Sequence, residues 1–246
     1  MKIPKNTLLN CRRGEVRVEK RKNSKSKRSP FKLLVIATLL IFAALTALFV
    51  INNSKDKDAT YEKIPPIEGQ PTLGKSDAPV TVVEFGDFKC PACKAWGESI
   101  YPQLVKDYVD TGQVKFSFVN VLFHGEESKL GSLAAEAVYK QNPDMYWEFH
   151  KALFKEQPRE NHDALWITSE KINEVAATIP DIDVNKLQED MKDQSVVEEV
   201  NTDDKLVQEF KVEKTPSIMI NGTMLGDPFD YEKIKNLLDK ELKGME

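Results

Sequence analysis

The chain has 246 residues and a formal net charge of −4, but this charge is distributed very unevenly. Residues 1–32 contain twelve lysines or arginines and two glutamates, a net of +10, which leaves −14 for the rest of the chain. This negative charge argues against nucleic-acid binding there, and three cysteines are too few for a scaffold held together by disulfide bonds.

A long apolar segment follows the basic tail. Leu33 to Ile51 are nineteen residues with Thr38 and Thr46 as the only polar members, enough as a helix to cross roughly 28 Å of hydrocarbon. This predicts a membrane span, and the excess of positive charge before it keeps the tail cytoplasmic and sends the remainder across. A cleaved signal peptide is the alternative, but the segment is longer than usual for one and has no clean A-x-A site. A nucleic-acid arm is a second interpretation of the tail, which membrane topology explains more simply.

The most informative motif follows a predicted strand. Val80 to Phe85 is dominated by β-branched and aromatic residues, which favours a buried strand. Turn residues follow, and the chain then runs Cys-Pro-Ala-Cys at residues 90–93. Pro91 suits the first position of a helix, which places Cys90 at the cap. There, unpaired backbone N–H groups and the helix dipole favour the thiolate.

Two cysteines at this spacing allow three interpretations. They can form a redox-active pair, contribute half of a zinc site, or be inert buried thiols. Zinc needs about four ligands, and the rest of the chain offers one cysteine and three histidines without a second CxxC or an HxxxH pattern. The position between a strand and a helix favours redox chemistry by Cys90 and Cys93.

A helix and a second strand are predicted next. Residues 92–109 carry apolar side chains on one helical stripe, and Pro102 should kink this helix. Val114 to Phe123 is the clearest predicted strand. The order strand, helix, strand implies a parallel βαβ unit, with the two cysteines at the carboxyl edge of the sheet, where α/β proteins form their sites.

Between residues 128 and 210 the apolar period becomes 3.6, which predicts a helical module. Helices are expected near residues 130–138, 146–153 (capped by Asp144), 168–178, 184–192 and 196–210. The last should start with a capping box formed by Ser195 and Glu198. His150 lies on an apolar stripe and is predicted to be a hydrogen-bonded core or rim histidine, and we expect the same of His124 and His162.

The strand pattern returns near the carboxyl terminus. Residues 217–220 and 223–225 predict two strands joined by a tight turn at Asn221 and Gly222. An amphipathic helix is predicted from about Asp230 to Lys243.

These motifs together resemble the DsbA-like branch of the thioredoxin superfamily, most closely the BdbD-type oxidoreductases of Gram-positive bacteria. The resemblance covers roughly residues 71–243 and depends on the CxxC after a strand, the inserted helices and Thr215-Pro216 before the next strand. The local matches are residues 69–71, 80–93 and 114–125. The implied fold class is α/β, a thioredoxin-like fold with an inserted helical domain, preceded by one transmembrane helix.

The charge pattern, the apolar segment and this resemblance together divide the chain into six parts. They are a cytoplasmic basic tail (1–32), a transmembrane anchor (33–52), a linker that leads into the folded part (53–75), the first part of a thioredoxin-like domain (76–127), an inserted helical domain (128–210) and the second part of the thioredoxin-like domain (211–246). We therefore expect a single-pass cell-membrane protein with a cytoplasmic amino terminus and an extracytoplasmic catalytic domain.

The resemblance also implies roles for five residues. Cys90 is the nucleophile that forms mixed disulfides, and Cys93 is the shielded resolving thiol. Thr215 and Pro216 match the family's cis-proline, which lies against the dithiol and pairs with an extended substrate; an ordinary strand-start proline is the alternative. Glu84 matches a buried acid under the dithiol, whose raised pKa suits proton relay to Cys93. A solvated acid at the strand end is the alternative for Glu84.

The implied enzyme is a disulfide oxidase that needs no cofactor for exchange. It acts on reduced or unfolded exported proteins with free thiols, is reoxidised by a quinone-linked thiol oxidase in the membrane, and works as a monomer without nucleic acid. Ala92 stands where the strongest oxidants have histidine, which removes a donor for the Cys90 thiolate. A disulfide reductase in the same compartment therefore remains an alternative, as does a non-enzymatic chaperone module that binds clients.

A structural calcium ion is the last implication of the resemblance. Gln70, Glu136 and Asp203 match the ligand positions, and oxygen ligands from separate segments suit calcium. Glu136 lies at the edge of a buried helical stripe, where a carboxylate needs a counter-charge. A surface salt bridge from Glu136 to Lys129 or Lys140 is the alternative.

Overall fold

The structure, a computed structural model, describes residues 11–12, 15–16, 30–54 and 57–244. The chain divides into two units, Met1–Asn53 and Ser54–Glu246. In the first unit, β1 (Cys11–Arg12) pairs antiparallel with β2 (Glu15–Val16), and α1 spans Pro30–Ser54.

The described ranges contain no helix that is both long and apolar enough to cross a membrane. The transmembrane prediction for residues 33–52 is therefore not confirmed and stays a prediction. Most of the predicted basic tail, residues 1–32, lies outside the described residues.

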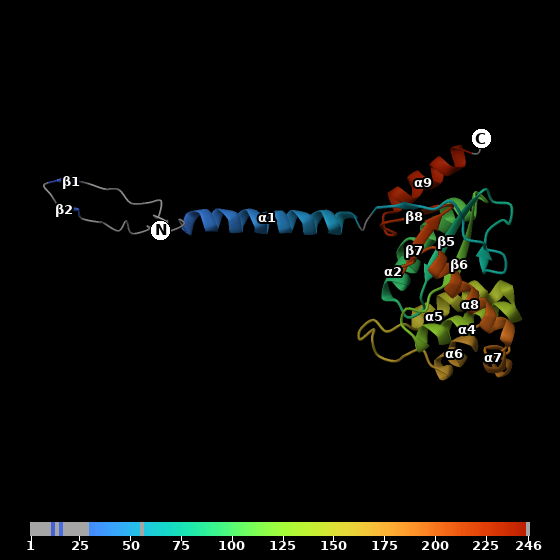
Figure 1. Cartoon of the computed structure of the whole chain (residues 1–246). Helices are drawn as coiled ribbons and strands as arrows, with labels where there is room; N and C mark the ends of the chain where they lie inside the picture. The colour runs from blue at the N-terminus through green and yellow to red at the C-terminus, as the bar shows by residue number, and fades with distance from the viewer. Residues whose placement is uncertain (1–10, 13–14, 17–29, 55–56, 245–246) are drawn as a thin grey trace, which may run out of the picture. The chain divides into compact units, whose positions relative to one another are not determined.

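A six-stranded sheet forms the centre of the second unit (Figure 1). Its strand order is β3-β8-β7-β5-β6-β4. The strands are β3 (Ala59–Thr60), β4 (Thr72–Leu73), β5 (Val80–Gly86), β6 (Val114–Asn120), β7 (Ser217–Ile220) and β8 (Thr223–Met224). β5 and β6 are parallel, as the predicted βαβ unit requires, and the other neighbouring pairs are antiparallel.

The central strand β5 is buried along its whole length. Helices cover both faces of the sheet, which explains why its sequence is an apolar run rather than an alternation. Val82 and Glu84 point to one face and Val83 and Phe85 to the other, because side chains alternate along a strand. The first face packs against α2 (Pro91–Ser99), α3 (Tyr101–Leu104) and α9 (Tyr231–Lys243), and the second against α8 (Gln194–Glu209). Glu84 therefore lies on the face that α2 covers.

The predicted helix 92–109 is divided into three pieces. α2 ends at Ser99, α3 follows at Tyr101, and a π-helical turn, η1 (Val105–Val109), completes the segment. The break lies just before Pro102, whose ring cannot continue a regular helix. β6 ends at Asn120, three residues before the predicted end, because its partner β5 ends at Gly86 opposite Asn120.

The helical module lies between β6 and β7 in the chain. It contains α4 (Glu126–Gln141), the 3-10 turn η2 (Pro143–Met145), α5 (Tyr146–Glu156), α6 (Ser169–Ala176), α7 (Val184–Asp190) and α8. In Figure 1 these helices gather at one end of the sheet. Their core includes Phe88, Cys90 and Cys93, so the dithiol lies where the module meets the sheet. Gly131 allows this contact, since a Cβ atom there would lie 3.1 Å from the Cβ of Phe88.

Two predicted helix caps are wrong. α8 is capped by Asp193, which accepts a hydrogen bond from the N–H of Ser195 at 2.9 Å, so Ser195 lies inside the helix. Asp144 lies inside η2, whose cap is Asn142. In both places two residues with good capping side chains lie two positions apart. The first apolar residue of the helix follows both of them, so the apolar pattern does not show which one is the cap.

Two short edge strands lie within the predicted linker 53–75. β3 pairs with β8, and the N–H of Tyr61 donates to the carbonyl of Gly222 at 2.7 Å. The Asp58 carboxylate pairs with the Lys233 ammonium at 2.7 Å. β4 pairs with β6 at the other edge of the sheet. Strands of two residues are too short to show an apolar period, which is why the sequence did not indicate them.

Candidate active site

Cys90 and Cys93 lie at the start of α2, directly after the turn that follows β5. Cys90 is the N-cap residue with Pro91 at the first helical position, as predicted. Cys90 is 7% exposed and Cys93 1% exposed, and both are free thiols. Cys90 is therefore the more exposed of the two cysteines.

The surroundings of Cys90 favour its thiolate. The hydrogen bond from the Cys93 thiol lowers the pKa of Cys90 to about 5, against the effect of burial, with further contributions from Thr215 and from the backbone N–H groups of Cys93 and Ala92. These N–H groups belong to the first turn of α2, where they have no partner in the helix. A thiolate is the form that attacks disulfides.

The surroundings of Cys93 have the opposite effect. Burial raises the pKa of Cys93 well above its usual value, and the hydrogen bond to Cys90 and the charge of Glu84 add to this. The N–H of Asp87, 3.4 Å from Cys93 Sγ, partly opposes the shift. Cys93 is therefore a protonated, shielded thiol at neutral pH.

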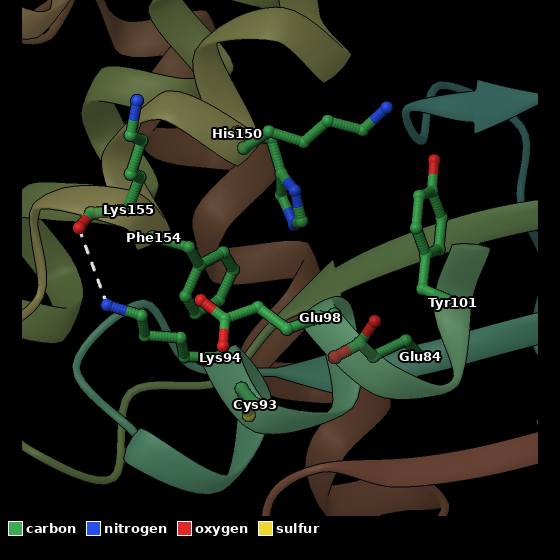
Figure 2. Close-up of a pocket in the computed structure, with 10 residues that line it drawn as sticks. Glu84, Cys93, Lys94, Glu98, Tyr101, His150, Phe154 and Lys155 are labelled. Atoms are coloured by element: carbon green, nitrogen blue, oxygen red, sulfur yellow. Dashed lines mark hydrogen bonds between the residues drawn. The ribbon is translucent and has the colours of Figure 1, made fainter.

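Glu84 is buried below this thiol, and its alternative interpretation as a solvated acid is wrong. Burial raises its pKa well above 4.5, and the charge of Cys90 raises it further. Glu84 and Cys93 both line a pocket of about 240 Å³ (Figure 2). The pocket also reaches Lys94, Gly97 and Glu98 of α2, away from the cap at Cys90.

His150 and Tyr101 line the same pocket. His150 is buried among aromatic side chains, as predicted for a core histidine. Its Nε2 atom, however, has no hydrogen-bond partner among the described residues, so the predicted hydrogen bond is not found there. Burial, with the charge of Lys151, lowers the pKa of His150 to about 3, so its ring stays neutral.

Thr215 and Pro216 lie immediately before β7 and close to Cys90. The Thr215–Pro216 peptide bond is cis, and Cys90 Sγ lies 3.4 Å from the carbonyl oxygen of Thr215. The structure thus brings together all five residues predicted for thiol chemistry: Cys90, Cys93, Glu84, Thr215 and Pro216.

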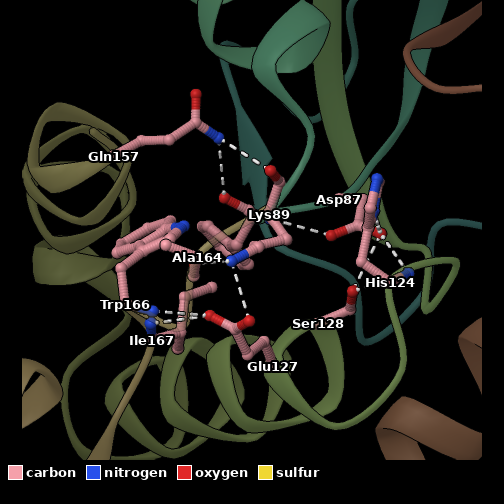
Figure 3. A network of polar contacts seen from close by, with 10 residues as sticks. Asp87, Lys89, His124, Glu127, Ser128, Gln157, Ala164, Trp166 and Ile167 are labelled. Atoms are coloured by element: carbon pink, nitrogen blue, oxygen red, sulfur yellow. Dashed lines mark hydrogen bonds and ion pairs between the residues drawn. The ribbon is translucent and has the colours of Figure 1, made fainter. Parts of the chain in front are cut away.

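The residue before Cys90 is held by the helical module (Figure 3). Lys89 forms a largely buried ion pair with Glu127, at 2.7 Å between Nζ and Oε1, and its Nζ also donates to the carbonyl of Ala164. Gln157 Nε2 donates to the carbonyl oxygens of Phe88 and Lys89 at 3.4 and 3.0 Å. These contacts fix the turn between β5 and α2, and no sequence pattern indicated them.

The three residues predicted for calcium also lie together. Gln70 Nε2 donates to Asp203 Oδ1 at 2.7 Å, and Asn120 Nδ2 donates to Glu136 Oε1 at 2.8 Å and to Asp203 Oδ2 at 2.7 Å. Burial and then the charge of Asp203 raise the pKa of Glu136 to about 8, and burial raises the pKa of Asp203 to about 7 against the hydrogen bonds of Asn120.

This cluster consists of buried oxygen atoms with no positively charged side chain paired to them among the described residues. Among the described residues, no ion pair joins Glu136 to Lys129 or Lys140, and Lys140 pairs with Asp193 instead. Gln70 Oε1 and Asn120 Oδ1 are buried and have no hydrogen-bond partner in the described part of the chain. No group of three or more His, Cys, Asp or Glu side chains suited to a metal occurs in that part either. The donor set of two carboxylates and two amide oxygens nevertheless fits a hard cation.

Asn120 and Asp87 are the polar residues that the sequence analysis missed. Asp87 follows β5 directly, and Asn120 is the last residue of β6. Because β5 and β6 are parallel neighbours, their carboxyl ends lie at the same edge of the sheet. A polar residue at the end of each predicted strand could therefore have indicated that Asp87 and Asn120 belong to the site.

The fold and the dithiol at the cap of α2 define a thioredoxin-like thiol protein with an inserted helical module. A sequence model of the Thioredoxin family matches residues 67–240. Disulfide bond formation protein D of Bacillus subtilis (strain 168) is 42% identical over 193 residues, 78% of this chain and 86% of that protein.

Solved structures give the same result. The crystal structure of oxidised BdbD from Bacillus subtilis has a TM-score of 0.71 and 43% identity, and the match covers 75% of this chain and 98% of that one. The crystal structure of Chlamydia trachomatis DsbA, at 20% identity, has a TM-score of 0.64 over 76% of this chain and 98% of that one, which supports the fold alone. The chain therefore belongs to the thioredoxin family and is a thiol-disulfide oxidoreductase with the predicted DsbA-like fold.

Proposed function

We propose that this chain is an extracytoplasmic disulfide oxidase that introduces disulfide bonds into exported proteins through Cys90 and Cys93. The observation that carries the proposal is the opposite shift of the two thiol pKa values, to about 5 for Cys90 and well above the usual value for Cys93. A stable Cys90 thiolate stabilises the reduced protein, which makes the disulfide form the better oxidant. Two relatives that carry the words disulfide bond formation in their names support this direction.

The reaction follows from the position of each group. A client thiolate attacks Cys90 Sγ in the Cys90–Cys93 disulfide, a mixed disulfide forms, and Cys93 leaves as a thiolate that takes a proton from Glu84. A second client thiolate then attacks the client sulfur of the mixed disulfide. The products are a client disulfide and the Cys90 thiolate, so two electrons pass from the client to the enzyme. A quinone-linked thiol oxidase in the membrane accepts these electrons and restores the disulfide.

Thr215 and Pro216 orient the client in this proposal. Thr215 and Pro216 precede β7 and lie outside its paired residues, and the Thr215 carbonyl oxygen lies 3.4 Å from Cys90 Sγ. An extended client chain can pair its backbone there while its cysteine faces Cys90. The enzyme acts on reduced or unfolded proteins as a monomer.

Comparison of the wild type with a double Cys90→Ala and Cys93→Ala variant tests the activity. We expect the wild type to speed oxidative refolding of a reduced disulfide protein and to reduce insulin poorly. Fast insulin reduction without oxidative refolding would instead establish the reductase. Equal suppression of client aggregation by both proteins, without thiol exchange, would establish a client-binding chaperone module.

The proposal places residues 1–32 in the cytoplasm, residues 33–52 in the cell membrane and the remaining parts outside, with residues 53–75 as the linker and residues 128–210 as the helical insertion. It is supported by the apolar segment and by the +10 charge before it. Protease added to intact cells should remove the catalytic domain and leave the tail protected. Release of the domain into the medium without proteolysis would show a cleaved signal peptide instead.

A structural calcium ion is part of the proposal. Gln70, Glu136 and Asp203 would hold it, with Asn120 beside them, and backbone carbonyls or water would complete its 6 to 8 oxygen ligands. When bound, the ion supplies the positive charge that the buried carboxylates lack. The segment before β4, α4 and α8 would then be joined through one centre.

A further inference from the structure

Asp87 touches both cysteines through its backbone. Its N–H donates to Cys93 Sγ at 3.4 Å, and its carbonyl accepts the N–H of Cys90 at 2.9 Å. Asp87 is completely buried in the turn between β5 and α2. The direction of its N–H therefore depends on how firmly this turn is held.

The Asp87 carboxylate is itself held from several sides (Figure 3). Oδ1 accepts the N–H of Lys89 at 2.8 Å. Oδ2 accepts the hydroxyl of Ser128 at 2.9 Å and lies 2.8 Å from Nδ1 of His124. Ser128 lies in the first turn of α4 and His124 just before that helix, so the helical module positions the turn that carries Asp87. A carboxylate buried without such partners would be strongly unfavourable.

We propose that the N–H of Asp87 is a fixed hydrogen-bond donor for the thiolate that forms on Cys93 when the active-site disulfide opens, and that His124 and Ser128 are positioning residues that aim it through the Asp87 carboxylate. This inference rests on the proposed function, in which Cys90 and Cys93 form the redox pair. It gives the helical module a direct part in the thiol chemistry.

The role follows from where charge develops in the reaction. When a thiolate attacks Cys90 Sγ, the bond to Cys93 Sγ breaks and its electron pair stays on Cys93. Negative charge therefore grows on the sulfur of a residue that is 1% exposed, where a donor from the protein itself is at hand. A donor that is already aimed stabilises such charge without reorganisation. The thiolate then takes a proton, so the stabilisation acts mainly in the transition state.

The test uses glutathione as the attacking thiol and the oxidised full chain in detergent as the target. Stopped-flow fluorescence gives the second-order rate constant for opening of the disulfide. We expect His124→Ala to slow opening about tenfold, which corresponds to about 1.4 kcal/mol in activation free energy. His124→Asn should restore the rate to within about twofold of the wild type, because its amide N–H replaces the Nδ1 donor.

Ser128→Ala and Ser132→Ala form a matched pair. Both serines are buried in α4, and Ser132 donates to the carbonyl of Ser128 at 2.9 Å without touching Asp87. Ser128 Oγ donates to Asp87 and also accepts the N–H of His124 at 3.0 Å, so Ser128→Ala should lose more stability than Ser132→Ala. With both variants folded, only Ser128→Ala should slow opening, by a few fold. The reduction potential and the pKa of Cys90 should stay unchanged, because Cys93 is a neutral thiol in the reduced protein.

Three results would decide against the inference. The first is that Ser128→Ala and Ser132→Ala open the disulfide at equal rates. The second is that folded His124→Ala opens it as fast as the wild type. The third is that the reduction potential of a slower variant shifts by enough to account for its slower opening. Failure of the wild type to show a Cys90–Cys93 disulfide that glutathione opens would reject the proposed function together with this inference.

Discussion

Cys90 and Cys93 are chemically identical side chains one helical turn apart, and their surroundings give them different tasks. The Cys90 sulfur receives hydrogen bonds and reaches the surface, whereas Cys93 is enclosed above Glu84. We expect iodoacetamide to modify only Cys90 in the reduced native protein, with a half-maximal rate near pH 5. Cys93→Ala should accumulate mixed disulfides through Cys90, and Cys90→Ala should accumulate few. Faster alkylation of Cys93 would reverse the assignment.

Glu84 is the proton partner of Cys93 in this scheme. Glu84→Gln keeps the shape of the side chain but cannot exchange a proton, so resolution of a mixed disulfide should slow about tenfold or more. The exposed Glu98→Gln is the matched control, because Glu98 lines the same pocket and should leave the rate unchanged. The measurement is the rate of release of a thiol from the Cys90 mixed disulfide between pH 5 and pH 9. Identical profiles for Glu84→Gln and the wild type would remove Glu84 from the mechanism.

At the scale of single elements, long periodic segments were predictable and their ends were not. β5, the start of α2 and the helices of the module follow from apolar periods that one chain segment carries by itself. The caps at Asp193 and Asn142 are local, but each has a second capping residue two positions away. The contacts of Asp87 and Asn120 depend instead on which segments meet in space. Their partners come from α4, α8 or the preceding turn, and no local pattern specifies such a meeting. Cys90 was predictable because the helix cap and its proline are neighbours in sequence.

The amino-terminal turn of α4 connects the module to the active-site turn. Glu127 accepts the N–H groups of Trp166 and Ile167 at 2.9 Å and pairs with Lys89. Burial alone would raise the pKa of Glu127, but the hydrogen bonds from Lys89 and from these two N–H groups lower it below 4.5. Because its pKa is depressed in the folded state, the stability that Glu127 contributes is present at neutral pH and is lost as pH falls through the folded pKa.

Glu127→Gln should therefore destabilise the protein at pH 7 by about 2 kcal/mol, since it leaves the Lys89 ammonium buried without its partner. The loss should shrink as pH falls through the lowered pKa of Glu127, because the wild-type carboxylate then becomes protonated. Urea unfolding at pH 7 and pH 3.5 measures both values. Glu126→Gln, the exposed neighbour in the same turn, should cost little at either pH. An equal loss for the two variants would mean that the ion pair does not stabilise the turn.

For the whole molecule, the Cys90 thiolate links stability to redox state. Its pKa is about 5 in the folded protein, against about 8.5 for a free thiol. A group whose pKa is lowered by folding contributes its stability in full above the unfolded pKa and loses it as pH falls through the folded pKa. The contribution at pH 7 is on the order of 2–3 kcal/mol, and the oxidised protein lacks it because it has no thiolate.

The reduced protein should therefore gain stability relative to the oxidised protein as pH rises from 5 to 8. Denaturant unfolding of both forms at pH 5, 6.5 and 8 measures the difference. Cys90→Ala cannot form the disulfide. Its stability should therefore be the same with and without added reductant at each pH. A pH-independent difference, or a clearly more stable oxidised wild type at pH 8, would favour a reductase.

The buried cluster of Gln70, Glu136 and Asp203 sets the last prediction for the molecule as a whole. An ion that binds only the folded state stabilises it by mass action, by about 2.7 kcal/mol at one hundred times its dissociation constant. For a domain of this size, that corresponds to roughly 5–10 °C in melting temperature. Millimolar calcium should raise the melting temperature of the wild type by about this amount, and EDTA should reverse the rise.

Asp203→Asn and Asp204→Asn separate this effect from nonspecific binding to an acidic protein. The two residues are neighbours in α8, but Asp203 is fully buried in the cluster and Asp204 is exposed. Asp203→Asn removes a carboxylate from the cluster, so calcium should no longer raise its melting temperature. Asp204→Asn should respond to calcium as the wild type does. A calcium response that survives Asp203→Asn would show that calcium binds elsewhere on the protein. A wild-type melting curve that EDTA and calcium leave unchanged, with no metal found by elemental analysis, would show that asparagine and glutamine side chains alone satisfy these carboxylates.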